Sequence, residues 1–143
     1  MKKIVVIYWS GSGNTEKMAA GVAEGARAAE AEVRIIPVDQ ASVADVLSAD
    51  GVALGCPAMG SEVLEEDEME PFICSLEQEN LSAVPVVLFG SYDWGDGEWM
   101  RDWEERMKKA GANLAGDGLI LQLEPDNDGM EQCRKLGKTL ADA

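Results

Sequence analysis

The stretch Ser10-Gly11-Ser12-Gly13-Asn14-Thr15 indicates the fold, because a strand-like apolar run precedes it at residues 4–8 and a helical pattern follows it from Glu16. The first N–H groups of a helix lack intrahelical acceptors, and the helix dipole is positive at that end. The two glycines let the backbone close around an anion, and the three hydroxyl side chains add donors. These six residues therefore predict a phosphate-binding turn between a strand and a helix.

This turn differs from two common nucleotide-binding motifs. It lacks the Gly-Lys-Ser/Thr ending of triphosphate-binding loops, and its spacing is not the three-glycine pattern of dinucleotide-binding proteins. We therefore expect it to hold a single terminal phosphate without a cation. Considered alone, a Ser-Gly turn could also be only a helix cap.

Strand-like and helix-like segments alternate along the chain. The expected strands are residues 4–8, 33–38, 51–55, 84–90 and 119–123, and the expected helices are 16–29, 43–47, 68–77, 98–110 and 128–141. This alternation predicts an α/β fold, a doubly wound five-stranded parallel sheet with helices on both faces and right-handed crossovers. A length of 143 residues suits one domain, residues 1–143.

Three loops of unusual composition follow expected strands, at residues 10–15, 56–66 and 91–97. A doubly wound sheet binds ligands at the carboxyl ends of its strands, where the strand order reverses. In the order 2-1-3-4-5 the first and third strands are neighbours across that reversal. We therefore expect the three loops to form one site.

The charge balance limits the possible partners. Twelve basic and 27 acidic residues give a net charge of -15, which repels nucleic acids and anionic membranes and attracts basic proteins. No segment approaches the ~20 apolar residues of a membrane span, and no cleavable apolar segment follows Met1, so we expect a cytoplasmic location. Histidine is absent and the three cysteines are widely spaced, so we expect no metal site, no disulfide and three buried thiols.

Longer motifs on the three loops resemble the flavodoxin family, specifically its short-chain type from anaerobic bacteria. They are Tyr-Trp-Ser-Gly-Ser-Gly-Asn-Thr-Glu-Lys-Met at 8–18, Gly-Cys-Pro-Ala-Met-Gly-Ser-Glu at 55–62, and Phe-Gly-Ser-Tyr-Asp-Trp-Gly-Asp-Gly at 89–97, followed by Glu-Trp-Met at 98–100. The resemblance covers essentially the whole chain. It implies a flavodoxin-like sheet that binds FMN tightly but non-covalently, in an electron-transfer protein rather than an enzyme.

The resemblance also implies roles for individual residues. Residues 10–15 resemble the phosphate cradle, and Met59 and Trp94 resemble the residues that flank the two faces of the isoalloxazine ring. Glu62 resembles the acceptor of the imide N–H, and Gly60 the glycine whose peptide turns over on reduction. The implied FMN-binding set is Ser10, Gly11, Ser12, Gly13, Asn14, Thr15, Pro57, Ala58, Met59, Gly60, Glu62, Ser91, Tyr92, Asp93, Trp94 and Gly95.

The implied function is low-potential one-electron transfer, mainly between the semiquinone and hydroquinone states. Asp93 stands where glycine is common in the relatives that this chain most resembles, and a carboxylate facing the ring should lower the second potential further. The implied partners are redox proteins with basic docking surfaces, and the chain is expected to be a monomer.

Three other functions remain open for a chain of this kind. A flavin-dependent quinone or flavin reductase on the same fold would need a substrate pocket beside the ring, and no insertion is present to build one. A phospho-receiver domain would need an acidic pair after the first strand, where Trp9-Ser10 stands. A flavin-free binding module would be colourless when purified.

Overall fold

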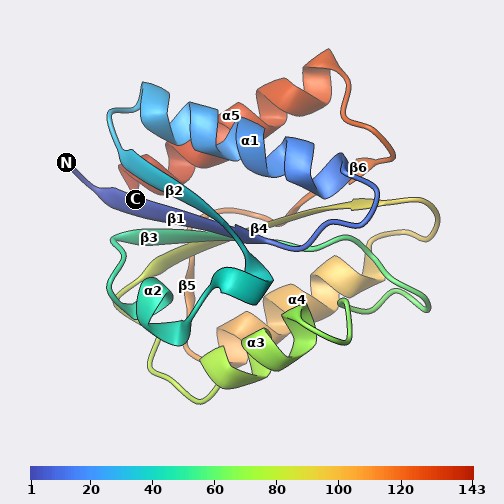
Figure 1. Ribbon diagram of the computed structural model, residues 1–143, viewed down its shortest axis with the longest axis horizontal. Helices are drawn as coiled ribbons and strands as arrows, with labels where there is room; N and C mark the ends of the chain where they lie inside the picture. The colour runs from blue at the N-terminus through green and yellow to red at the C-terminus, as the bar shows by residue number, and fades with distance from the viewer.

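Six strands make one parallel sheet in the computed structural model, which describes all 143 residues (Figure 1). The spatial order is β2-β1-β3-β4-β5, and β6 also pairs with β4. Every pairing is parallel, so the predicted order 2-1-3-4-5 is confirmed. The strands are β1 (Lys3–Tyr8), β2 (Glu32–Pro37), β3 (Gly51–Gly55), β4 (Pro85–Tyr92), β5 (Asn113–Leu114) and β6 (Leu119–Gln122).

The fifth position of the sheet is divided between two short strands. Asn113 of β5 pairs with Pro85 at the start of β4, and Leu119 of β6 pairs with Phe89 farther along the same strand. Residues 115–118, Ala-Gly-Asp-Gly, separate them. Glycine and aspartate are poor strand formers, so the chain leaves the sheet there and returns. The sequence predicted only the second of these segments.

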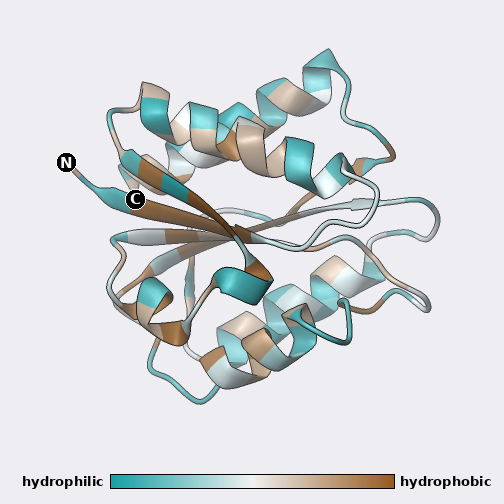
Figure 2. Ribbon diagram, viewed as in Figure 1, coloured by the Kyte–Doolittle hydropathy of each residue, from teal (hydrophilic) through white to brown (hydrophobic).

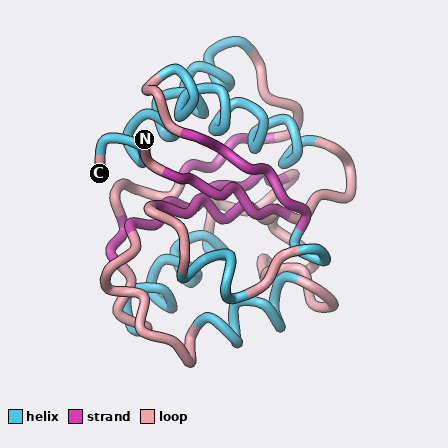
Figure 3. The backbone as a smooth tube through the Cα atoms, turned by 60° about the vertical axis from the view of Figure 1, so that its left-hand side comes forward, coloured by secondary structure: helices cyan, strands magenta, loops and turns pink.

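Helices cover both faces of the sheet (Figures 1 and 3). One face carries α1 and α5, and the other carries α2, α3 and α4. The helices are α1 (Asn14–Ala28), α2 (Val43–Leu47), α3 (Met69–Leu76), α4 (Glu98–Lys109) and α5 (Asn127–Asp142), with a 3-10 turn, η1 (Val38–Gln40), before α2. The predicted helices are confirmed, with ends that differ by two residues at most.

Glycines let α1 and α5 approach each other closely. A Cβ added to Gly25 of α1 would overlap the backbone carbonyl of Arg134 in α5, and one added to Gly137 would overlap that of Val22. The two helices therefore pack backbone against backbone on one face of the sheet.

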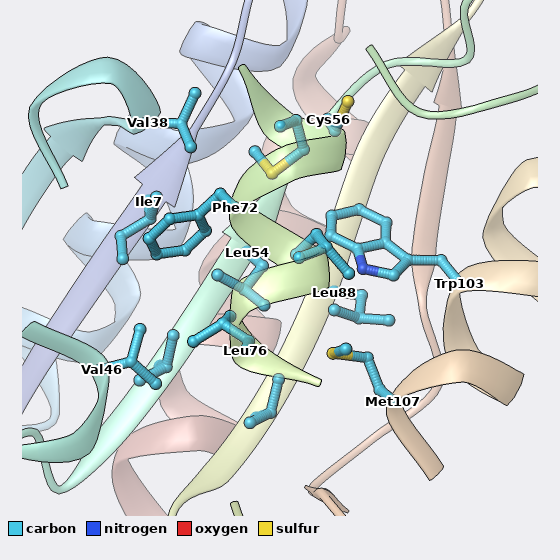
Figure 4. Packing of buried hydrophobic residues seen from close by; sticks show 14 of the residues in the cluster. Ile7, Val38, Val46, Leu54, Cys56, Phe72, Leu76, Leu88, Trp103 and Met107 are labelled. Carbon is cyan, nitrogen blue, oxygen red and sulfur yellow. The ribbon is translucent and has the colours of Figure 1, made fainter. Parts of the chain in front are cut away.

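Two hydrophobic clusters lie on either side of the sheet. Every residue of β3 is buried, as expected for a central parallel strand covered on both faces, and polar residues concentrate on the outer faces of the helices (Figure 2). Figure 4 shows Leu54 and Leu88 of the sheet beside Leu76 of α3 and Trp103 of α4. The larger cluster thus joins α3 and α4 to the strands that end at the loops 56–66 and 91–97.

The cysteines differ from the expectation of three buried thiols. Cys56 and Cys133 are buried, and burial raises the pKa of Cys56 to about 12 and that of Cys133 to about 11. Cys74 is exposed, because it shares the outer face of α3 with Glu70, one turn earlier. All three thiols are free.

None of the helices combines the length and apolar character needed to cross a bilayer.

Candidate functional site

A hollow of about 220 Å³ opens where the three predicted loops meet, beyond the carboxyl ends of β1, β3 and β4. These strand ends point to the right in Figure 1. Of its lining residues, all except Trp9 belong to the set predicted from the sequence. The lining residues are Trp9, Gly11, Ser12, Asn14, Pro57, Ala58, Met59, Ser91, Tyr92 and Asp93. The structure therefore brings segments from all three loops to one place.

Residues 10–15, the cradle, form a turn held by serine side chains. Ser10 Oγ accepts hydrogen bonds from the N–H groups of Gly13 (3.1 Å) and Glu16 (3.3 Å), and Gly13 has a φ of 95°. The N–H groups of Gly11, Ser12 and Thr15 have no acceptor within the protein. Unpaired N–H groups at the start of a helix suit an anion, so the cradle fits a phosphate.

Thr15 contributes to the site differently from the expectation. Its hydroxyl is buried and lies 2.8 Å from Ser91 Oγ, and it also accepts the Ser91 N–H at 3.3 Å. The hydroxyl therefore joins the start of α1 to the end of β4, and Thr15 offers the cradle its backbone N–H instead.

The second loop begins with a tight turn at residues 59–63. Met59 and Val63 exchange two backbone hydrogen bonds of 2.9 and 3.0 Å. Gly60 has a φ of 50°, and a Cβ there would meet nothing within 4 Å. The Gly60 peptide thus lies in open space, in a backbone region that favours glycine.

Glu62 is buried and caps helix α4. Its Oε1 accepts the N–H groups of Gly97 (3.1 Å) and Glu98 (3.2 Å), while Gly97, the N-cap of α4, has no side chain that could do so. Glu62 Oε2 makes no hydrogen bond and remains able to accept an N–H from a ligand. Nothing in the motif around Glu62 indicated this capping role.

Glu65 caps helix α3 in a similar way. Its buried carboxylate accepts the N–H groups of Asp67 (2.7 Å), Glu68 (2.8 Å) and Met69 (3.0 Å). Burial acts to raise the pKa of Glu65, but these backbone hydrogen bonds outweigh it and the pKa is lowered. Part of the acidic run 65–70 therefore serves the start of a helix.

The third loop carries an indole into solvent. Trp94 is 63% exposed, and the loop turns at Gly95 and Gly97, whose φ values are 95° and 93°. Most of the Trp94 indole surface is therefore available for contact with a ligand or a partner. Trp94 does not line the hollow itself, and neither do the predicted residues Ser10, Gly13, Thr15, Gly60, Glu62 and Gly95.

Trp9 is the lining residue that the sequence prediction missed. Its indole Nε1–H donates to Glu68 Oε1 at 3.1 Å, and a Cβ on Gly11 would lie 3.0 Å from the indole Cη2. Its position beside Ser10 in the motif 8–18 could have indicated that Trp9 lines the site.

Known proteins of one family match this chain over nearly its whole length. The family model for flavodoxin matches residues 6–137. The flavodoxin of Clostridium beijerinckii is 47% identical over 136 residues, which cover 95% of this chain and 97% of that protein. The flavodoxin of Megasphaera elsdenii is 43% identical over 140 residues, covering 98% and 99%.

Solved structures agree with the sequence comparison. The solution structure of two-electron reduced Megasphaera elsdenii flavodoxin matches with a TM-score of 0.88 at 42% identity, covering 98% of this chain and 99% of that one. A short-chain flavodoxin associated with a bacterial microcompartment matches with a TM-score of 0.90 at 25% identity, covering 99% and 98%. The likeness extends over the sheet, both helical layers and the three loops.

Proposed function

Because this chain belongs to the flavodoxin family, we propose that it carries electrons one at a time at low potential, mainly between the semiquinone and hydroquinone states of FMN. Family membership makes it an FMN-binding electron-transfer protein and not an enzyme. We further propose that residues 1–143 act as one domain and as a monomer in the cytoplasm.

The convergence of the three loops on one hollow carries the proposal. The unpaired N–H groups of Gly11, Ser12 and Thr15 support a phosphate position in the cradle. The other proposed FMN contacts come from the same three loops. They are Ser10, Gly13, Asn14, Pro57, Ala58, Met59, Gly60, Glu62, Ser91, Tyr92, Asp93, Trp94 and Gly95.

Met59 and Trp94 support a position for the flavin ring. Met59 lines the hollow, and Trp94 offers an exposed indole from the opposite loop. A planar aromatic ring between a thioether and an indole would bury apolar surface on both of its faces. We propose that the ring lies between these two side chains.

Bound FMN supplies reversible one-electron chemistry, and the protein sets the potentials by binding the oxidation states unequally. The Gly60 peptide can reorient at small cost because glycine tolerates both turn geometries and nothing crowds it. Its carbonyl oxygen is then available to accept a hydrogen bond from a protonated ring nitrogen. Glu62 Oε2 can accept the imide N–H while Oε1 continues to cap α4.

Negative charge around the hollow supports a low potential for the second electron. Asp93 lines the hollow, Glu66 and Asp67 are exposed on the segment that follows β3, Asp96 is exposed on the third loop, and the chain carries a net charge of -15. Adding negative charge to a site surrounded by carboxylates is unfavourable, although solvent screens the exposed ones. The same charge favours redox partners with basic docking surfaces.

Stepwise anaerobic reduction of the purified protein, followed by its visible spectrum, tests the proposal. We expect a band near ~450 nm that gives way to a long-wavelength band at half reduction, with two separate midpoint potentials. A colourless protein would contradict the cofactor assignment. A single two-electron step would contradict one-electron carriage.

A further inference from the structure

Trp9 contacts both the cradle and the start of helix α3. One edge of its indole packs against Gly11, where an added Cβ would lie 3.0 Å from Cη2. Its Nε1–H donates to Glu68 Oε1 at 3.1 Å. Trp9 also directly precedes the cradle along the chain, so its indole contacts the cradle at one edge and the start of α3 through its N–H.

Trp9 and Met59 form a wall that two hollows share. Both side chains line the hollow of about 220 Å³ and a second hollow of about 560 Å³. The remaining lining of the second hollow comes from the loop that follows β3, namely Gly60, Ser61, Val63, Glu65, Glu66 and Asp67. The Trp9 and Met59 side chains therefore lie between the two hollows.

Glu68 holds the Trp9 side chain in place through a hydrogen bond. Its backbone N–H is held by Glu65 Oε1 at 2.8 Å, in the cap that begins α3. Its side chain makes a single hydrogen bond, to Trp9, and none to any residue of the cradle. A carboxylate acceptor makes that bond stronger and more directional than a neutral one would.

We propose that Trp9 is a positioning residue that couples the phosphate half of the FMN site to the half that holds the ring. A phosphate in the cradle holds Gly11 against the indole and so keeps the indole where Glu68 accepts its N–H. The wall that Trp9 forms with Met59 is thereby set for the flavin ring. This inference rests on the proposed function.

Coupling of this kind is reciprocal, because one free energy links the two halves. The phosphate must then contribute more to affinity in a protein with the Trp9–Glu68 bond than in one without it. The ratio of the dissociation constants of riboflavin and FMN measures that contribution, since riboflavin lacks only the phosphate. A purely structural role for Trp9 would weaken both flavins alike and leave the ratio unchanged.

The experiment measures both dissociation constants for the full-length apoprotein of the parent, Trp9→Phe, Glu68→Met and the double variant. We expect the ratio to fall about tenfold in each single variant and no further in the double variant, because each removes the same hydrogen bond. Glu68→Gln keeps an acceptor oxygen but makes a weaker, neutral hydrogen bond, so it should lower the ratio less than Glu68→Met does. Glu66→Met removes a neighbouring exposed charge that makes no hydrogen bond with Trp9 and should keep the parental ratio.

A second measurement follows the indole N–H resonance of Trp9, which is assigned by its loss in Trp9→Phe. We expect it to differ between the riboflavin and FMN complexes of the parent, and inorganic phosphate should move the riboflavin complex toward the FMN position. Identical resonances in the two complexes would overturn the coupling.

The remaining outcomes are also decisive. An unchanged ratio in Trp9→Phe and Glu68→Met would overturn the coupling alone. A Glu68→Gln variant that behaves like Glu68→Met would overturn it too, because charge and not the hydrogen bond would be responsible. A parent that binds neither flavin would overturn the proposed function and this inference with it.

Discussion

Asp93 lines the hollow, and its side chain is exposed. Its backbone carbonyl accepts the side-chain N–H of Gln122 at 3.1 Å, so the end of β6 fixes its position. Its φ is not in the left-handed region, unlike those of Gly95 and Gly97. Aspartate therefore fits this position without backbone strain, and its effect on the site should be mainly electrostatic.

We predict that Asp93→Gly raises the potential at which the second electron enters. Removing a carboxylate from the lining of the hollow makes it less unfavourable to add a negative charge to the flavin. An exposed charge is worth about 0.2–1 kcal/mol, which corresponds to about 10–40 mV for one electron. Redox titration of parent and variant at fixed ionic strength measures the shift.

Asp96→Asn is the matched control for Asp93→Gly, because Asp96 is an exposed acidic residue of the same loop that does not line the hollow. It should move the potential less. An unchanged or lower potential in Asp93→Gly, or an equal shift in the control, would show that Asp93 does not act on the ring.

At the scale of the element, Glu62 joins the turn 59–63 to the start of α4. We predict that Glu62→Ala lowers the free energy of unfolding of the apoprotein by about 1–2 kcal/mol, because the N–H groups of Gly97 and Glu98 lose their acceptor. Glu62→Gln keeps one acceptor oxygen and should lose less. Urea unfolding of the apoprotein separates this effect from any contact with FMN.

Glu66→Ala is the control for the cap, since Glu66 is an exposed carboxylate of the same loop and should change stability by less than about 0.5 kcal/mol. Equal losses in Glu62→Ala and Glu66→Ala would contradict the capping role.

Arg106 joins α4 to α3. Its guanidinium donates to Glu70 (2.7 and 2.8 Å) and to Glu77 (2.8 and 3.3 Å). The hydrogen bond from Arg106 is the main cause that lowers the pKa of Glu70. A carboxyl whose pKa is lower in the folded state stabilises the fold above its unfolded pKa of about 4.3, and this contribution is lost as the pH falls through the folded value.

We predict that Arg106→Met is less stable than the parent at pH 7, by about 1 kcal/mol because the pairs are partly exposed. The difference should shrink as the pH falls through the lowered pKa of Glu70, below which Glu70 is protonated in both proteins. Urea unfolding across this range measures it. Arg101→Met, which removes an exposed pair with Asp96, is the control and should show a smaller difference. A difference that does not depend on pH would contradict the role of Glu70.

The elements of the fold were largely predictable, because buried parallel strands must be apolar and the helices that cover them must be amphipathic. β5 was missed because Asn113 and Leu114 are too few to form a periodic pattern. The site was predicted from motifs, and what the motifs missed depends on distant contacts. The cap that Glu62 provides for α4 and the bond from Trp9 to Glu68 join residues that lie 35 and 59 positions apart.

The net negative charge of the chain acts on stability and on association in opposite directions. With 27 acidic and 12 basic residues, the folded chain repels itself, and compaction brings these charges closer together. The exposed ion pairs, such as Lys17 with Glu124 and Arg134 with Glu131, are individually weak. They leave the excess of acidic residues without basic partners. Screening should therefore relieve more repulsion than it removes attraction.

We predict that raising the salt concentration from about 0.01 to about 0.15 M, which shortens the Debye length from about 30 to about 8 Å, stabilises the protein by about 1 kcal/mol. Over the same range the association rate with a basic redox protein should fall, because screening weakens electrostatic steering. Urea unfolding and stopped-flow mixing measure the two effects, and NaCl and KCl should act alike because screening depends on ionic strength. Stability that falls with salt would mean that the attraction within ion pairs outweighs the net repulsion. The net charge of -15 would then affect mainly the association with partner proteins.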